Sequence, residues 1–319
     1  MEAIKEPDWN TIGILGAARG ARGSTEGPMG TEHLLAGITT ARGPARTALD
    51  DEGATRTALL AVLRDTMDRD DAWTGTDDAE ASVAAQDVLG EDGDRNRLTG
   101  AAARSLTTAM NQAQREGAAK FTAVHLLRAL LEENNRAVEL LTACRVSPQA
   151  VRARLDGEPT GVQDDLSPLL HPTRDILLGR SHYRHLPFWQ RWILKFAGMN
   201  WASNPAWWVS METHAQAHRL DNGPVGTEHV LLAILATHEV ALHYPHLSKN
   251  STPDADGDHL TRLGINYTSV HTALTKSPIH LTPDPHPTRK YLEETTGPLI
   301  ETLLREDTRA RQLIEALTS

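Results

Sequence analysis

The sequence has few of the features that mark secreted, membrane-spanning or nucleic-acid-binding proteins. It contains a single cysteine, Cys144, so no disulfide can form within the chain, and the apolar run 140–144 around it predicts a buried, structural thiol. No apolar run is long enough to span a bilayer, and the first residues form no apolar signal segment. We therefore expect a soluble, cytoplasmic protein.

Aromatic residues and positive charge are also scarce. Aromatics make up 4% of the chain and the net charge is −10. A general nucleic-acid-binding protein carries a basic face, so nucleic acid is not an expected partner, and an acidic chain does not favour a membrane surface either. With so few aromatics, the core must consist mainly of Leu, Ala, Val and Ile, which favours helices over sheets. The predicted fold class is all-α.

A short motif, Gly-Thr-Glu-His followed by apolar residues, recurs along the chain. It occupies 30–35, returns almost unchanged at 226–232, and has a degraded copy at 122–127. Thr31 suits a helix N-cap, and Glu32 falls in the first turn, where the helix dipole favours a carboxylate. The recurrence indicates an internal repeat in which the motif begins a helix. The histidines of the three copies, His33, His125 and His229, are expected to pack and to form hydrogen bonds.

Capping residues and apolar periodicity predict two sets of four helices in the first half of the chain: 9–21, 31–40, 45–51 and 55–64, then 101–116, 122–132, 135–143 and 148–155. We therefore place one repeat at 1–64 and a second at 98–157. Residues 65–97 are acidic and poor in apolar residues, which is typical of a solvated linker that could contain a short helix at 79–89. The alternative is an acidic docking segment. Residues 165–319 form a second pair of repeats, of which the last is shortened and lacks the motif. The long stretch at 245–259 is expected to be a loop.

An insert at 185–208 follows the first helix of the third repeat. Five of the seven tryptophans fall between 189 and 208. The insert could be a helix packed onto its own domain, a surface for a protein partner or, less favoured by the charge, a membrane-docking helix. The candidate partner-binding residues are Phe188, Trp189, Arg191, Trp192 and Phe196.

The sequence contains few residue patterns that indicate a catalytic or metal site. His214 and His218 are four residues apart on a predicted helix, so both imidazoles could bind one metal ion. Ala215 stands where a zinc protease would carry glutamate, which excludes that chemistry. No nucleophile–base pair is evident, so we expect no catalytic residues, no resident metal and no cofactor. A histidine-dependent metal protein stays open as an alternative.

The repeated unit resembles the Clp N-terminal repeat, the substrate-receiving domain of Clp unfoldases, and is most similar to the amino-terminal domain of ClpC-type proteins. The resemblance is carried by residues 30–35, 226–232, 48–53 and 140–146. It implies two tandem all-α domains, each made of two repeats, over 9–156 and 168–317. The chain has no Gly-x-x-x-x-Gly-Lys-Ser/Thr phosphate loop, so it is not itself an unfoldase.

The resemblance also implies ligands. In ClpC-type domains the glutamate of the motif faces the guanidinium of phosphoarginine, which makes Glu32 and Glu228 candidates; Val124 replaces it in the second copy. The alternative is that both glutamates bind no ligand and only stabilise the N-termini of their helices. ClpC-type domains are also targets of cyclic-peptide antibiotics, and Trp9 and Ile12 are candidates for such a site.

The expected function is that of a non-enzymatic, stand-alone binding protein of the Clp protease system. It would bind peptides, protein substrates or adaptors, and it could act as a decoy that sequesters cyclic-peptide antibiotics. The alternatives are a regulator that binds a Clp unfoldase through the insert and the metal protein named above.

Overall fold

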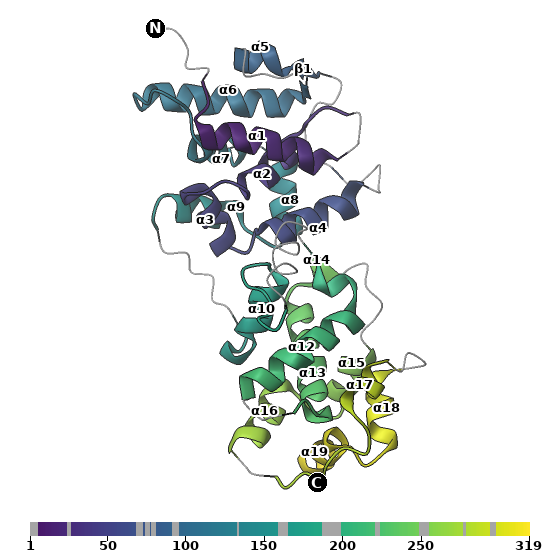
Figure 1. Cartoon of the computed structure of the whole chain (residues 1–319). Helices are drawn as coiled ribbons and strands as arrows, with labels where there is room; N and C mark the ends of the chain where they lie inside the picture. Colours follow the sequence, from purple (N-terminus) through teal and green to yellow (C-terminus); the bar gives the residue numbers. More distant parts are fainter. Residues whose placement is uncertain are drawn as a thin grey trace. The chain divides into compact units, whose positions relative to one another are not determined.

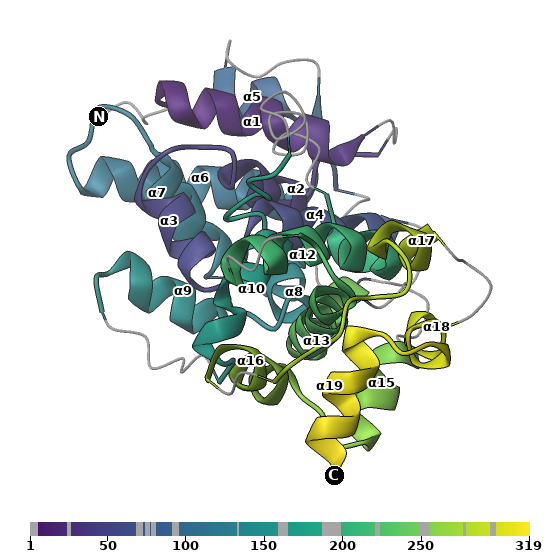
Figure 2. The same ribbon diagram turned by 60° about the horizontal axis from the view of Figure 1, so that its bottom comes forward.

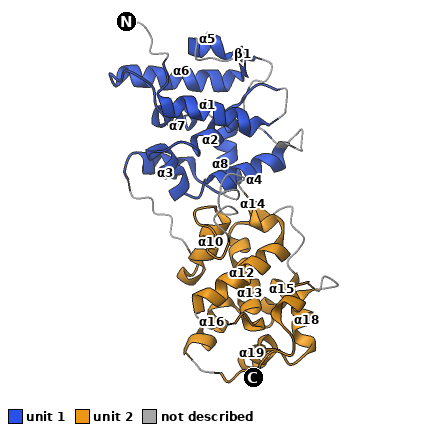
Figure 3. Ribbon diagram, in the orientation of Figure 1, with its two compact units in different colours: residues 1–163 blue, residues 164–319 orange. Residues whose placement is uncertain are grey.

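The computed structural model describes residues 6–23, 27–67, 73, 77, 81–90, 96–132, 134–158, 165–186, 199–220, 224–248, 255–276, 279–293 and 298–319. The chain is mostly helical and separates into two compact units, residues 1–163 and 164–319 (Figure 3). The prediction of a helical fold is confirmed. In the described part of the chain, the sheet consists of two short antiparallel strands, β1 (Val83–Ala84) and β2 (Arg97–Leu98).

The helices of unit 1 follow the sequence-based predictions within a few residues (Figure 1). Local capping explains this agreement. The Thr99 hydroxyl accepts a hydrogen bond from the backbone N–H of Ala102, and the Ser147 hydroxyl accepts one from Ala150. The helices are α1 (Trp9–Arg22), α2 (Thr31–Ile38), α3 (Pro44–Asp51), α4 (Arg56–Met67), α5 (Ala85–Leu89), α6 (Gly100–Arg115), α7 (Ala123–Leu130), α8 (Arg136–Ala143) and α9 (Pro148–Leu155).

Helix α2, which begins with the first copy of the motif, is the centre of unit 1. All eight of its residues are buried, and it packs against α1, α4, α6, α7 and α8. Gly37 permits the close approach of α1, because a Cβ atom at this position would lie 2.5 Å from the carbonyl oxygen of Ile14. The apolar sequence of α2 is therefore that of a core helix covered on all sides.

The described elements of unit 2 are η2 (Pro168–Leu170), α10 (His171–Leu177), η3 (Trp201–Ser203), α12 (Pro205–Leu220), α13 (Thr227–His243), α14 (Pro245–Ser248), α15 (Ala255–Arg262), α16 (Tyr267–Lys276), α17 (Thr288–Glu293), α18 (Leu299–Arg305) and α19 (Arg309–Thr318). Helix α13, which begins with the second full copy of the motif, lies at the centre, with α12, α15, α16 and α19 packed around it (Figure 2). Gly257 on α15 faces the ring of His238 on α13 so closely that a side chain there would collide with it.

Equivalent helix pairs recur in the two units. Helix α1 packs on α2 as α12 packs on α13, and α2 packs on α8 as α13 packs on α19. A further pair of contacts corresponds in the same way: α3 packs on α7 in unit 1, and α15 packs on α18 in unit 2. The helices that pack around the motif helix of unit 1, α2, therefore correspond to those that pack around the motif helix of unit 2, α13.

Helices α3, α8 and α15 are each followed by a residue in the left-handed conformation. Gly53 (φ 92°), Arg145 (φ 59°) and Gly264 (φ 76°) follow α3, α8 and α15. After each of them, a backbone N–H reaches back to the helix: Ala54 to Leu49 O at 2.9 Å, Val146 to Leu141 O at 2.9 Å, and Ile265 to Leu260 O at 3.1 Å. This bond satisfies a carbonyl that the helix end would leave without a partner.

The short helix expected at 79–89 is present as α5, whereas two other expectations need correction. Part of the segment 65–97, expected to be solvated, is ordered structure: α4 extends to Met67, β1 pairs with β2, and Asp77 is buried. The expected loop at 245–259 contains α14 and the first turn of α15. Helix α12 begins at Pro205, inside the segment 185–208, so the end of that segment belongs to the helix that packs on α13. In the segment 65–97, the burial of Asp77 and the pairing of β1 with β2 override an acidic composition.

None of the helices, over the parts of the chain that the structure describes, combines the length and apolarity needed to cross a bilayer.

Candidate binding sites

The first copy of the motif begins a helix whose N-terminus is tied to two other segments by one buried carboxylate. Asp77 accepts hydrogen bonds from the backbone N–H and the hydroxyl of Thr31, both at 3.0 Å. The same carboxylate accepts the Thr99 hydroxyl at 2.9 Å and the backbone N–H of Arg136 at 3.2 Å. Asp77 therefore joins the starts of α2, α6 and α8.

Unit 2 contains the same arrangement. Asp284 accepts from the backbone N–H of Thr227 at 2.9 Å, from its hydroxyl at 2.6 Å, and from the backbone N–H of Arg309 at 2.9 Å. The threonine hydroxyl in turn accepts the next backbone N–H of the partner helix, from Ala310 at 3.0 Å, just as Thr31 accepts from Ala137 at 3.1 Å. The threonine hydroxyl thus satisfies a backbone N–H in the first turn of the partner helix. The N-caps of its own helices are Gly30 and Gly226, so the prediction of Thr31 as an N-cap is wrong.

The candidate glutamates lie beside these caps, buried against arginines of the same chain. Glu32 is 2% exposed, and its Oε1 lies 3.6 Å from Nη1 of Arg136. Glu228 is 3% exposed, and its Oε1 lies 2.8 Å from Nη1 of Arg309. Among the described residues, neither glutamate Oε2 and neither arginine Nε has a hydrogen-bond partner. Each carboxylate therefore faces a guanidinium but keeps one buried acceptor unused.

Glycine and histidine complete the motif. The backbone N–H of Gly30 donates to Nδ1 of His33 at 3.1 Å, and that of Gly226 donates to Nδ1 of His229 at 3.0 Å. Burial lowers the pKa of His229, opposed by the neighbouring charge of Glu228, so its imidazole stays neutral and can accept this bond. The packing and hydrogen-bonding role expected for these histidines is confirmed.

The degraded copy keeps the histidine but changes the three other positions of the motif, including the threonine, which is replaced by Ala123. The backbone N–H of Thr122 donates to Nδ1 of His125 at 3.0 Å, so this part of the motif is unchanged. The glycine is replaced by Thr122 and the glutamate by Val124. Helix α7 therefore begins with the same histidine cap but without a buried carboxylate.

Trp9 and Ile12, the candidates for a cyclic-peptide site, lie on α1. Trp9 is 86% exposed and Ile12 39% exposed. Gly13 and Gly16 on the same helix have open space where a side chain would be. The exposed side of α1 thus offers two large apolar side chains next to bare backbone.

The five candidates of the insert, Phe188, Trp189, Arg191, Trp192 and Phe196, lie outside the described residues. The described end of the insert contributes to the core of unit 2. Trp208 and Trp201 are buried at 1% and 5% exposure, whereas Trp207 is 40% exposed and its ring lies 4.8 Å from that of Trp201.

The histidine pair lies on the exposed side of α12. The ring of His185 approaches that of His214 to 5.4 Å. Burial, and then the neighbouring charges of His214 and His218, lowers the pKa of His185. Across the described ranges, no group of three or more His, Cys, Asp or Glu side chains is placed so that it could hold a metal ion.

Reasoning from the sequence missed the two aspartates and the two arginines that surround the motif. Arg136 and Arg309 could have been found, because each follows a helix cap and precedes alanine in stretches that align between the units, Asn135-Arg136-Ala137 and Thr308-Arg309-Ala310. Asp77 and Asp284 had no such signal. Asp77 is 46 residues away from Thr31 in the sequence, and Asp284 is 57 residues away from Thr227. Asp77 also lies among other acidic residues.

Comparison with known families identifies part of the chain. Residues 97–175 match the family of the Clp repeat (R) N-terminal domain. This part of the chain is a Clp repeat domain. The match covers β2 and α6–α9 and ends in α10, and no ATPase family matches the chain. No curated protein matches it.

Proposed function

We propose that this protein is a non-enzymatic binding protein of the Clp proteolytic system. The observation that carries the proposal is the Clp repeat domain at 97–175, which is a binding module without catalytic activity. Its partners would be the peptides, protein substrates or adaptors that Clp unfoldases receive. The direct test is binding of the purified chain to the purified Clp unfoldase, adaptors and substrates of the same organism. Failure to bind any of them would overturn the proposal.

We further propose that the chain is four Clp repeats in two pairs. Repeats one and two would occupy 1–64 and 98–157, and a divergent pair would occupy 165–319. The support is the equivalence of the hydrogen bonds around Thr31 and Thr227, made by Asp77 in one unit and Asp284 in the other.

Glu32 and Glu228 are the proposed contacts for the guanidinium of phosphoarginine. Two observations support this role. Each carboxylate already faces a guanidinium of its own chain, which a ligand guanidinium would replace, and each Oε2 lacks a hydrogen-bond partner among the described residues. A buried acceptor without a partner costs about 1–3 kcal/mol, which a ligand N–H would recover.

Calorimetry with phosphoarginine tests these sites. We expect the wild-type chain to bind at two sites, Glu32→Gln and Glu228→Gln each to abolish one of them, and the double variant to abolish both. Glutamine keeps the shape of the side chain and removes its charge. Glu301→Gln is the matched control, because Glu301 is an exposed carboxylate in the first turn of α18. Absence of binding by the wild type would leave Glu32 and Glu228 with a structural role at their helix starts.

A cyclic-peptide decoy is the second ligand proposal for the same protein. Trp9 and Ile12 would form the contact, supported by their exposure and by the bare glycines beside them on α1. We expect ClpC-directed cyclic peptides to bind the wild-type chain and to bind at least about tenfold more weakly to Trp9→Ala. Leu242→Ala removes another exposed apolar side chain, in unit 2, and should change nothing. Equal affinity for wild type and Trp9→Ala would reject this site.

A regulator that binds a Clp unfoldase through residues 185–208 is the alternative. The exposure of Trp207 favours it, since tryptophan is often an anchor in protein interfaces. Because α12 begins at Pro205 and Trp208 is buried, point variants of exposed residues test this better than deletion of the insert. Trp207→Ser should weaken binding to the unfoldase if the alternative holds and leave it unchanged if the repeats bind instead.

A further inference from the structure

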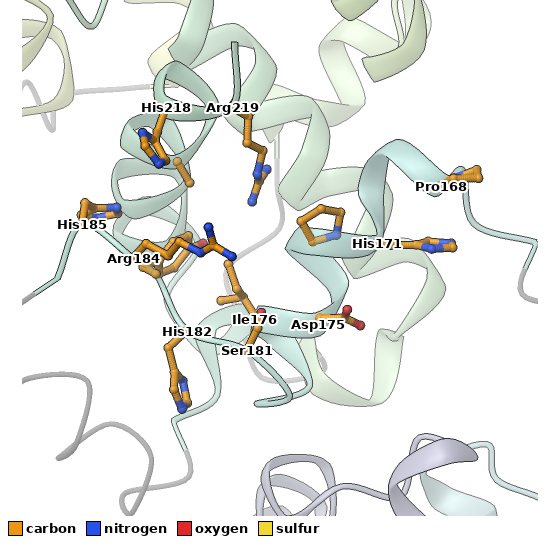
Figure 4. Close-up of a pocket in the computed structure, with 13 residues that line it drawn as sticks. Pro168, His171, Asp175, Ile176, Ser181, His182, Arg184, His185, His218 and Arg219 are labelled. Atoms are coloured by element: carbon orange, nitrogen blue, oxygen red, sulfur yellow. The ribbon is translucent and has the colours of Figure 1, made fainter. Parts of the chain in front are cut away.

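Unit 2 contains a pocket that none of the functions above uses. It lies between α10, the residues 181–185 that follow it, and α12, and its volume is about 500 Å³ (Figure 4). Cavities of roughly 300–1,000 Å³ are typical of small-molecule sites. Its walls combine apolar groups, including Pro172, Ile176 and Ala215, with several basic side chains.

A buried hydrogen-bond network fixes the base of this pocket. The carboxylate of Glu212 is completely buried and accepts from Tyr183 OH at 2.7 Å, Thr173 Oγ1 at 2.8 Å, Gln216 Nε2 at 2.9 Å and Arg219 Nη1 at 2.6 Å. Burial, followed by the charge of Glu212, raises the pKa of Tyr183, which therefore remains a phenol and a donor. With four donors to one carboxylate, Tyr183 and Arg219 are held in place before any ligand binds.

Positive charge exceeds negative charge around the pocket, although the chain as a whole is acidic. Asp175, an acidic residue of the lining, is contacted by Arg174 at 2.8 Å and by Arg180 at 3.7 Å. Glu212 is paired with Arg219. Both carboxylates are thus compensated without Arg184, which makes no ion pair or hydrogen bond with the described residues.

Arg184 and the Glu212-paired Arg219 both line the pocket. In Figure 4 the guanidinium groups of Arg184 and Arg219 point toward each other across the pocket, with His185 and His218 together on one side. Guanidinium groups bind carboxylates and phosphates through paired N–H donors.

We propose that this pocket binds a small organic anion. Its carboxylate or phosphate group is held between Arg184 and Arg219, and its apolar part lies against Pro172 and Ile176. The test of this site does not depend on the proposed Clp-system role.

The experiment is a titration of the full chain with small anions at low ionic strength, in which binding is measured by calorimetry or NMR. The probes are phenyl phosphate, benzoate, inorganic phosphate and the uncharged benzamide. We expect phenyl phosphate or benzoate to bind with a Kd below about 1 mM, inorganic phosphate to bind more weakly, and benzamide not to bind. The comparison of phenyl phosphate with benzoate shows which anionic group the arginines prefer.

Arg184→Gln is the decisive variant, because Arg184 is an exposed residue of the pocket lining and its loss leaves the Glu212 network intact. We expect it to weaken binding at least about tenfold, the effect of losing a charge-assisted hydrogen bond. Arg262→Gln, an exposed arginine on α15, should stay within about twofold of wild type. Ala215→Phe should also abolish binding by filling the pocket without changing any charge.

Three results would overturn the proposal. The first is that neither organic anion binds the wild-type chain. The second is that benzamide or inorganic phosphate binds as tightly as the organic anions. The third is that Arg184→Gln binds with wild-type affinity.

Discussion

The carboxylate of Glu32 occupies the space that a side chain on Gly30 would need. A Cβ atom placed on Gly30 would collide with Glu32 Oε2, and the same collision recurs between Gly226 and Glu228. In the degraded copy the glycine is Thr122 and the glutamate is Val124. Glycine and glutamate thus form a structural pair in which the glutamate can be buried only if the residue two positions before it has no side chain.

The first prediction is that Gly30→Thr destabilises the protein, because the threonine Cβ displaces the buried Glu32 carboxylate. We expect a loss of about 2 kcal/mol in the free energy of unfolding, typical of overpacking at a rigid site. The double variant Gly30→Thr/Glu32→Val, which copies positions 122 and 124, should recover more than half of this loss. Urea denaturation followed by circular dichroism measures both values.

A matched comparison is Gly16→Thr on α1, where a side chain would meet open space. This substitution should leave stability unchanged or raise it slightly, because threonine has a somewhat higher helix propensity than glycine. Additive effects of Gly30→Thr and Glu32→Val in the double variant would contradict the pairing.

The second prediction concerns Asp77. Asp77→Ala removes a buried acceptor of four hydrogen bonds and leaves the donors of Thr31, Thr99 and Arg136 without their partner. We expect a destabilisation of about 3–5 kcal/mol, as for the loss of one member of a buried charged network. Asp87→Ala removes an exposed carboxylate from α5 and should change stability by less than about 1 kcal/mol. Similar stabilities for the two variants would mean that Asp77 does not hold the three helix starts together.

The helices of unit 1 depend on local sequence signals, whereas the roles of Asp77 and Asp284 depend on contacts with distant residues. The helices of unit 1 were predictable because their signals are local. Thr99 and Ser147 cap helices that begin at the next residue, and Pro44 and Pro148 occupy the first turn. The motif at 30–33 was predictable as a helix start for the same reason.

The candidate sites were less predictable because they depend on contacts between distant segments. Nothing local distinguishes Asp77, which is buried, from the other acidic residues of its segment. The sequence placed Glu32 and Glu228 at helix starts but could not reveal that Arg136 and Arg309 face them. The pocket of unit 2 is a further example, since Arg184 and Arg219 belong to separate elements that only the fold brings together.

The third prediction is a loss of stability on acidification that depends on His229. Because burial lowers its pKa below the ordinary value of 6.5, the unfolded chain takes up this proton before the folded chain does. The free energy of unfolding should therefore fall as the pH is lowered through about 6.5. The groups facing the ring, Glu228, Asp284 and Arg309, do not reverse this direction.

Urea denaturation at pH 7.5 and 5.5 measures this dependence. His229→Gln should reduce the difference between the two pH values, whereas His280→Gln, at an exposed position, should leave it unchanged. The same pH dependence in wild type and His229→Gln would assign the effect to other groups.

The fourth prediction is that the thiol of Cys144 does not react in the native protein. Cys144 is 4% exposed, and burial raises its pKa to about 12, so at pH 8 only about one thiol in ten thousand is ionised. Ellman's reagent should label it only after unfolding in urea. Thr142→Cys provides a positive control at an exposed position of the same helix and should react at once. Rapid labelling of the wild-type chain under native conditions would show that the end of α8 opens readily.

The fifth prediction is that Arg145→Gly stabilises the protein. Arg145 adopts φ 59°, a conformation that costs a non-glycine residue about 1 kcal/mol, while the equivalent corners carry Gly53 and Gly264. Glycine removes this cost, although it also gains freedom in the unfolded chain, so we expect a net gain of no more than about 0.5 kcal/mol. Arg145→Ala, which deletes the same exposed side chain but keeps the Cβ atom, should give no gain. If alanine stabilises as much as glycine does, the side chain and not the backbone conformation is the source of the strain.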